Sequence, residues 1–223
     1  MDGLLLLDKP KQWTSHDLVD LVRRKTGLQA VGHAGTLDPM ATGLMILLLG
    51  KATKRSIEFT GLDKSYRGSI RLGTVTDSWD LEGKIVGEKP VPELSVSEIQ
   101  KELDSLLGQQ NFVPPAFSAI KKNGVRSHAR ARRGEIVVSE PRPMRIDRLT
   151  LERFETPEVY FDMDCSKGTY VRSIAFVLGE KLGCGAVLSS LVRTRIGSFK
   201  LAEAMDEETF LKCPLEMLER KLR

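Results

Sequence analysis

Residues 32–43 read GHAGTLDPMATG and stand directly before the apolar run LMILLLG at residues 44–50. The stretch contains three glycines, one proline and a single acidic residue, Asp38. A proline after Asp38 disfavours helical geometry at the aspartate, and the glycines permit tight turns and close approach by another molecule. The pattern therefore predicts a stiff loop that presents one carboxylate just before a buried strand.

The loop alone leaves the role of Asp38 open. The carboxylate could be a nucleophile, a general base, a metal ligand, or a turn cap that bonds its own backbone. A phosphate-binding loop around Gly50 and Lys51 is excluded because Ala52 stands where serine or threonine is required. The later stretch DSWDLEG lacks the alternating acids of a calcium loop.

A second candidate residue is Arg172, in the stretch CSKGTYVRSIAF. An arginine fork can orient a carboxylate through two parallel hydrogen bonds and lower its pKa. Arg172 stands near the start of an otherwise apolar helical pattern, so the alternative is an exposed helical arginine. The sequence does not place Arg172 beside Asp38 in space.

The composition excludes several classes of protein. The chain has 223 residues, 41% of them hydrophobic, and no apolar run approaches the roughly 20 residues of a membrane span. The N-terminal GLLLLDKP is too short for a secretory signal, so we expect a cytoplasmic protein without membrane contact. The spacing of Cys165, Cys184 and Cys213 and of the histidines predicts neither a disulfide framework nor a metal site.

Positive charge is concentrated between residues 121 and 148, although the net charge is only +4. Such density is the usual electrostatic signature of binding to a phosphate backbone, and the alternative is a solvated face without a partner. The acidic residues of this stretch are Glu135, Glu140 and Asp147. The basic residues are Lys121, Lys122, Arg126, Arg130, Arg132, Arg133, Arg142, Arg145 and Arg148.

The pattern of elements favours an α+β fold around a mixed sheet, because strands and helices do not alternate strictly. A helix should begin after Thr14 and end at Gly27, and a second should follow the capping-box pair Ser95 and Glu98. Strands are expected at residues 3–9, 44–50, 65–73, 144–154, 159–164 and 187–196. Helices are expected at 52–59, between the last two strands, and as short pieces near the C-terminus.

The segments around Asp38, together with DKP and TS upstream and CSKGTYVRSIA and LVRTRIGSF downstream, resemble the bacterial transfer-RNA pseudouridine-55 synthases, the TruB family. The resemblance extends from Gly3 to about Phe199. It implies the pseudouridine synthase fold, with a mixed, mostly antiparallel sheet flanked by helices. It also implies one catalytic domain over residues 1–223, with an RNA-gripping insertion at about 110–148.

The resemblance further implies that uridine 55 in the T loop of transfer RNA is isomerised to pseudouridine after the base flips out. Because substrate and product are isomers, neither a cofactor nor a metal is expected. Whether Asp38 attacks C1′, attacks C6 or acts as a base stays open. The resemblance implies catalysis by Asp38, stacking of Tyr66 on the target base and pairing of Arg172 with the aspartate. It also implies a uracil pocket lined by Tyr170 and Leu191, and replacement of the flipped base by His33. For Lys9 and Pro10 it implies a mainly structural role.

The sequence departs from the family at two places. Family members commonly have a tyrosine where His128 stands, in the insertion that is expected to contact RNA through Lys121, Lys122, Arg126, Arg130, Arg132 and Arg133. Relatives also continue into a small C-terminal RNA-binding domain of the PUA type. About two dozen residues follow Phe199, too few for that domain, so we expect it to be absent from this chain, either because this branch of the family lacks it or because the chain is a fragment.

Three hypotheses about the working protein remain. The first is a monomeric enzyme that binds the T stem-loop of transfer RNA without a protein partner. The second is an RNA-binding folding helper whose catalysis is incidental. The third is a related isomerase that modifies ribosomal RNA through a guide complex.

Overall fold

The chain divides into two compact units, described by a computed structural model for residues 1–117, 121–122, 125–126 and 140–223. Unit 1 contains Met1–Arg67 and Leu191–Arg223, and unit 2 contains Gly68–Ser190. Strands β4 (Lys64–Leu72) and β12 (Ala186–Ile196) each contribute residues to both units. Among the described residues, no helix combines the length and the apolar character that crossing a membrane requires.

Unit 1 is organised around β3 (Thr42–Leu49), whose central residues are buried on both faces. One edge of β3 pairs antiparallel with β1 (Gly3–Lys9) over the full length of that strand. The other edge changes partner, because β2 (Val31–Ala34) pairs with residues 46–49 and β12 pairs in parallel with Thr42 and Gly43. The remaining elements of unit 1 are α1 (Ser15–Thr26), the 3-10 helix η1 (Gly50–Arg55), α2 (Ser56–Thr60), β13 (Phe199–Lys200), the 3-10 helix η2 (Leu201–Glu203), α6 (Glu207–Lys212) and α7 (Leu215–Arg220).

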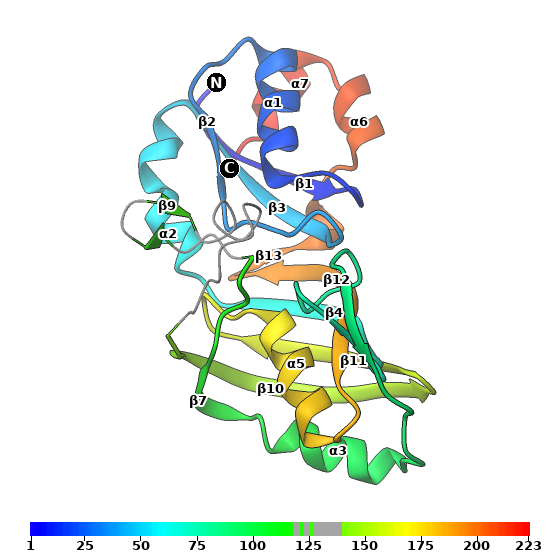
Figure 1. Ribbon diagram of the computed structural model, residues 1–223. Helices are drawn as coiled ribbons and strands as arrows, with labels where there is room; N and C mark the ends of the chain where they lie inside the picture. The colour runs from blue at the N-terminus through cyan, green and yellow to red at the C-terminus, as the bar shows by residue number, and fades with distance from the viewer. Residues whose placement is uncertain (118–120, 123–124, 127–139) are drawn as a thin grey trace. The chain divides into compact units, whose positions relative to one another are not determined.

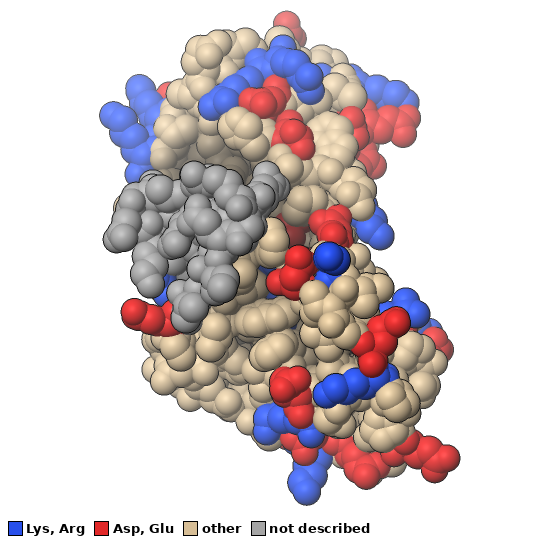
Figure 2. Space-filling view, in the orientation of Figure 1, with Lys and Arg blue, Asp and Glu red and all other residues tan. Residues whose placement is uncertain are grey.

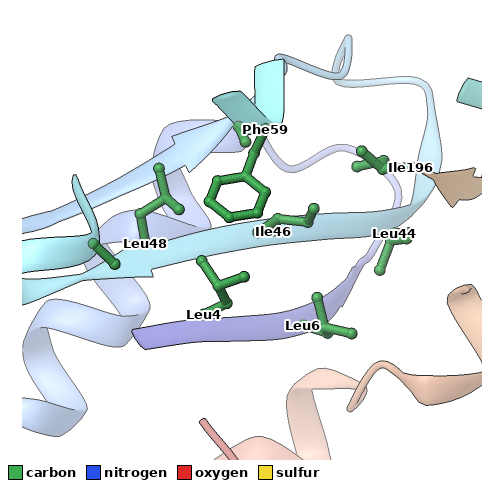
Figure 3. Close-up of a cluster of buried hydrophobic side chains, with 9 residues drawn as sticks. Leu4, Leu6, Leu44, Ile46, Leu48, Phe59 and Ile196 are labelled. Atoms are coloured by element: carbon green, nitrogen blue, oxygen red, sulfur yellow. The ribbon is translucent and has the colours of Figure 1, made fainter. Parts of the chain in front are cut away.

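One face of the β1–β3 pair forms an apolar cluster, shown in Figure 3. Alternate residues of each strand point to it, as the two-residue period of a strand requires. The 3-10 and α-helical segments after β3 close the cluster with Phe59. Its labelled members are Leu4, Leu6, Leu44, Ile46, Leu48, Phe59 and Ile196.

Helix α1 covers the opposite face of β3, where the Ser15 hydroxyl lies 3.9 Å from the Met45 sulfur. Thr14 and Asp17 form a capping box at its start, and Gly27 ends it in the left-handed conformation at φ 71°. Lys25 of α1 lies over the ring of Phe210 in α6. Figure 1 shows the two chain ends close together, where the backbones of Leu4 and Arg223 exchange hydrogen bonds.

Unit 2 contains a second antiparallel ladder, in which β10 (Arg142–Glu155) lies between β7 (Gly108–Phe112) and β11 (Glu158–Cys165). Helix α3 (Val96–Asp104) packs on β10 through its buried residues Ile99 and Leu103. Its N-terminus carries the predicted capping box of Ser95 and Glu98. The other elements of unit 2 are β5 (Thr74–Thr76), β6 (Ile85–Glu88), β8 (Lys121–Lys122), β9 (Val125–Arg126) and α5 (Val171–Lys181).

The predicted α+β class and the mixed, mostly antiparallel sheet are confirmed, with the β3–β12 pairing as the parallel component. The predicted strands, caps and main helices also occur close to their expected positions. Strand β2 was not predicted, so His33 lies on a strand opposite Leu47 and not within the loop. The sequence of β2, VGHA, contains a glycine and lacks the alternation that indicates a strand.

Candidate active site

The Asp38 loop, residues 35–41, leaves β2 where β3 exchanges that partner for β12. The residue before the aspartate is fixed by Ser15 at the start of α1. The Leu37 N–H donates to Ser15 Oγ at 2.9 Å, and the Ser15 hydroxyl donates to the Leu37 carbonyl at 3.1 Å. Both Ser15 and Leu37 are buried, so this pair anchors the loop in the interior of unit 1.

The residue after the aspartate is fixed as well. The Pro39 carbonyl accepts from the Gln12 N–H at 2.8 Å and from Lys9 Nζ at 3.3 Å. Lys9 is fully buried and also donates to the carbonyls of Pro10 and Trp13, at 3.0 and 2.6 Å. These bonds join the segment after β1 to the Asp38 loop, and they agree with the structural role expected of Lys9.

Asp38 itself begins a tight turn. The Ala41 N–H donates to the Asp38 carbonyl at 3.1 Å across Pro39, which takes the second turn position where its fixed φ is favoured. Met40 and Ala41 are buried, whereas Asp38 is only half-buried. The turn therefore holds the aspartate backbone while its residue stays partly accessible.

Other predicted site residues of unit 1 come from three strands. Tyr66 lies on β4 and is 6% exposed, Leu191 lies on β12, and His33 lies half-buried on β2. Arg193 of β12, a residue that sequence reasoning did not single out, is fully buried and donates to the carbonyls of Leu44 and Gly35, at 2.8 and 3.1 Å. Unit 1 thus contains Asp38, Tyr66, His33 and Leu191.

Unit 2 contains the other two, Tyr170 and Arg172, at the start of α5. Arg172 is 4% exposed, so it is not an exposed helical arginine. Its guanidinium donates to the carbonyls of Ser78 and Phe117, at 3.1 and 2.9 Å. An oxygen of Asp80 lies 3.4 Å from the same guanidinium.

Asp80 was missed by the sequence reasoning. Its carboxylate accepts from the Ser78 hydroxyl at 2.6 Å and from the Glu82 N–H at 3.1 Å, in addition to facing Arg172. The residue is 4% exposed although it stands in a polar turn. No local pattern distinguishes it from a solvated turn aspartate, so only the fold reveals its partner.

The pairing of Asp38 with Arg172 stays a prediction, because Asp38 belongs to unit 1 and Arg172 to unit 2. Each unit fixes one of these two residues through contacts of its own. Unit 1 fixes the backbone on both sides of Asp38. Unit 2 fixes the guanidinium of Arg172 through three protein oxygens.

The basic residues between positions 121 and 148 include arginines that pair with carboxylates and residues that are expected to contact RNA. Arg145 pairs with Asp147 at 2.9 Å, and Arg148 pairs with Asp164 at 2.9 Å and also with Asp162. On the face drawn in Figure 2, basic and acidic side chains are interspersed. Of the residues expected to contact RNA, Lys121, Lys122 and Arg126 belong to the β8–β9 hairpin, whereas Arg130, Arg132 and Arg133, like His128, lie outside the described residues.

The described part of the chain contains no group of three or more histidine, cysteine, aspartate or glutamate side chains arranged to hold a metal ion. The three cysteines are buried, and no disulfide joins them. The groups gathered around the candidate site residues are instead carbonyls, hydroxyls, guanidinia and single carboxylates. Such groups orient a polar substrate or hold a charge in place.

Comparison with known proteins assigns the family. A family profile described as "TruB family pseudouridylate synthase (N terminal domain)" matches residues 23–171, more than half of the chain. The chain belongs to the TruB family of pseudouridylate synthases. The members of this family are isomerases, and the resemblance seen around Asp38 is confirmed.

Curated relatives within the TruB family cover nearly the whole chain. A protein of Opitutus terrae named tRNA pseudouridine synthase B is 49% identical over 222 residues, which cover 100% of this chain and 92% of the relative. A protein of the same name from Syntrophotalea carbinolica is 43% identical over 93% of this chain and 68% of its own length.

Solved structures confirm the predicted pseudouridine synthase fold. A chain from a Cbf5-Nop10-Gar1 complex superposes with a TM-score of 0.76 at 25% identity, over 99% of this chain. A chain from an H/ACA ribonucleoprotein bound to a substrate RNA superposes with a TM-score of 0.72 at 23% identity. This TruB-family chain spans 59% and 58% of the lengths of those two chains.

Proposed function

We propose that this chain converts uridine 55 in the T loop of transfer RNA to pseudouridine. The observation that carries the proposal is the 49% identity to a tRNA pseudouridine synthase B over the full chain, with Asp38 on a loop anchored on both sides. In this reaction the N1–C1′ bond breaks, the uracil turns, and a C5–C1′ bond forms while the C5 proton is lost and N1 gains one. The residues proposed to act on the substrate are Asp38, Tyr66 and Arg172.

The proposed roles follow from charge and burial. Asp38 supplies the carboxylate, and the fixed guanidinium of Arg172 keeps it ionised and aimed. Extruding the target base costs a few kcal/mol, and stacking on Tyr66 returns about 1–3 kcal/mol of it. The T-loop target, the flipped base and a cytoplasmic location all belong to this proposal.

The decisive experiment incubates the protein with unmodified transfer RNA, without additives, and maps pseudouridine by position. We expect modification at uridine 55 by the wild-type protein and a loss of at least about 100-fold in Asp38→Asn, the scale expected when a side chain that takes part directly in the reaction is removed. The matched control is Asp63→Asn, which changes an aspartate elsewhere in unit 1. Pseudouridine formed by Asp38→Asn at the wild-type rate, or only at another position, would refute the proposal.

RNA binding by the basic stretch has a separate test. Each phosphate contact contributes about −0.7 to −0.9 to the slope of log affinity against log salt. We expect Lys121→Ala/Lys122→Ala to make this slope shallower by about 1.5. The control is Arg145→Ala/Arg148→Ala, because both guanidinia are already paired with carboxylates and should change the slope less. Equal changes in the two double variants would contradict the assignment.

The similarity to a Cbf5 chain favours a second candidate, an isomerase that needs a guide complex. The two candidates differ in what the isolated chain does. Modification of bare transfer RNA by the purified protein supports the stand-alone enzyme. Modification only in the presence of a guide RNA and further proteins supports the second candidate.

A further inference from the structure

Trp79 stands in the turn between β5 and β6 and has an unusual backbone conformation. Its φ is 63°, in the left-handed region, and among the described residues only Gln12 and Trp79 adopt a positive φ without being glycine. A bulky side chain stays in this region only where the surrounding structure holds it there. The contacts of Trp79 therefore indicate what this turn is built to hold.

The indole of Trp79 lies flat against the ring of Phe176 in α5. The ring centroids are 4.3 Å apart and the planes are inclined by 17°, so the two rings stack. Both residues are half-buried. Phe176 follows Arg172 by four residues, which places the two side chains on one face of the helix. The Trp79–Phe176 stack thus joins the turn to the face of α5 that carries Arg172.

The residues on either side of Trp79 are the ones that contact Arg172. The Ser78 carbonyl accepts from the guanidinium at 3.1 Å, and the Asp80 carboxylate lies 3.4 Å from it. Ser78, Asp80 and Arg172 are all buried. Because Trp79 stands between the two residues that supply these oxygens, a displacement of Trp79 moves both of them.

The turn and α5 are each attached to β12. The Leu188 N–H donates to the Trp79 carbonyl at 3.0 Å, and the Leu81 N–H donates to the Leu188 carbonyl at 3.2 Å. Helix α5 approaches β12 so closely that a Cβ on Gly179 would lie 2.1 Å from the Ala186 nitrogen. The Trp79–Phe176 stack adds a direct contact between the turn and α5.

We propose that Trp79 and Phe176 are positioning residues for Arg172. The inference rests on the proposed function, in which the Arg172 guanidinium keeps Asp38 ionised and aimed. Neither ring is assigned a contact with the substrate. The stack holds the turn against α5, so that the oxygens of the turn fix the guanidinium in one orientation.

A spectroscopic test needs no RNA. The guanidinium N–H resonances of Arg172 are assigned by their loss in Arg172→Lys, and their exchange with solvent is measured in each variant. We expect Phe176→Leu and Trp79→Leu to speed this exchange about 2- to 10-fold, the range set by the loss of one aromatic pair. Val177→Ala, at the next position of α5, is the control and should leave the exchange unchanged. An unchanged exchange rate in a folded Phe176→Leu or Trp79→Leu protein overturns the proposal.

The two substitutions also cover a variant that fails to fold. Trp79→Leu changes a residue in the left-handed region, whereas Phe176→Leu removes the same stack from within a helix. Trp79→Gly adopts φ 63° without strain but has no ring, so it separates the backbone conformation from the stack. We expect faster exchange in Trp79→Gly as well. A wild-type exchange rate in that variant would show that the ring does not hold Arg172.

The kinetic test separates positioning from contact with RNA. We expect Phe176→Leu to lower kcat about 10-fold, less than the roughly 100-fold cost of a full 1 Å misplacement, and to leave KM for transfer RNA unchanged. Phe176→Tyr keeps the ring and should retain wild-type kcat. A raised KM with unchanged kcat would assign the rings to RNA binding and overturn the positioning role.

The outcomes of the two proposals are distinguishable. If the wild-type protein forms no pseudouridine, the proposed function fails, while the exchange measurements still decide whether the stack fixes Arg172. If the wild type is active and Phe176→Leu retains full kcat, the positioning role fails. Trp79→Leu/Phe176→Leu should lose no more kcat than the larger single loss, because both changes remove one interaction, and additive losses overturn the proposal.

Discussion

Asp38 and Asp80 show two opposite ways of building an aspartate into a loop. At Asp38 the backbone carries the anchors, since Ser15 fixes the preceding residue and Gln12 and Lys9 fix the following one. At Asp80 the carboxylate is the anchor, because it binds Ser78, the Glu82 N–H and Arg172. The first residue is half-buried, and the second is almost fully buried.

The difference teaches how a fold keeps one acid available for chemistry. A carboxylate that satisfies buried donors contributes to stability and becomes expensive to remove. The backbone anchors on either side of Asp38 do not use its carboxylate, so they should survive replacement of that side chain. Stability and activity should therefore respond in opposite ways at the two aspartates.

The largest expected effect on stability is at Asp80. Asp80→Asn removes the charge that faces the buried Arg172 guanidinium, and breaking a buried pair costs about 3–5 kcal/mol. Urea unfolding measures the loss, and Asp38→Asn should lose less, because Asp38 is only half-buried. A loss at Asp80 no larger than that at Asp38 would remove the distinction.

A double variant sharpens the interpretation of Asp80. Asp80→Leu/Arg172→Met replaces both charges with apolar groups, and such replacements are often neutral or stabilising. We expect it to recover at least half of the stability lost in Asp80→Asn. Without recovery, the loss would come from packing or from the Ser78 and Glu82 bonds.

The second prediction concerns Gly43, at the end of the Asp38 segment. Gly43→Ala places a Cβ 2.4 Å from the Arg193 carbonyl oxygen at φ 107°, so strain and clash should destabilise unit 1 by at least about 2 kcal/mol. Gly32→Ala is the matched control, since the nearest atom lies 4.0 Å from its new Cβ. Equal unfolding midpoints would show that β12 can move away from β3.

A smaller effect is expected at Ser15. Ser15→Ala leaves both backbone groups of buried Leu37 without this hydroxyl, at a cost of about 1–3 kcal/mol. Because the freed segment precedes Asp38, kcat should fall while affinity for transfer RNA stays. His16→Ala is the control on the same helix. A loss of stability with unchanged kcat would show that Leu37 does not position Asp38.

The smallest effect is expected at Asp8, an intermediate case. Its carboxylate accepts from the Gly43 N–H at 3.1 Å, and burial raises its pKa above the usual value. A raised pKa means that folding favours the protonated form, so Asp8 lowers stability as pH rises above the unfolded value of about 3.9. Asp8→Asn keeps an acceptor and removes that penalty.

The thermal midpoint checks this prediction across pH. At pH 7, Asp8→Asn should unfold above wild type, by no more than about 2–4 °C, the change that 1 kcal/mol produces in a chain of this size. The difference should vanish below pH 3.9, where Asp8 is protonated in both states. A wild type that is more stable at pH 7 would contradict the sign.

Much of the fold could be predicted because its signals are local. The capping boxes of α1 and α3, the glycine after α1 and the apolar run of β3 each lie within a few residues. Strand β2 was not predicted, because its four residues include a glycine and do not alternate between apolar and polar side chains. Its strand geometry comes from pairing with β3, which is a tertiary effect.

The site could be predicted only in part, for the same reason. The glycines and the proline mark the Asp38 loop, and the family resemblance supplies the other site residues. Ser15, Asp80 and Arg193 have no comparable signal, because each acts through a partner at least several residues away that only the fold brings near. Their hydrogen bonds show why the loop is stiff, which the sequence pattern could only suggest.

The exchange of partners along β3 has a consequence for biosynthesis. Residues 42 and 43 pair with β12, which the ribosome makes about 150 residues later. Until β12 is made, this edge of the apolar strand β3 has no strand to pair with, and contacts between residues so far apart in sequence form slowly. The segment with Asp38 should therefore reach its final form among the last parts of unit 1, which keeps a nascent chain from acting on RNA before synthesis is nearly finished.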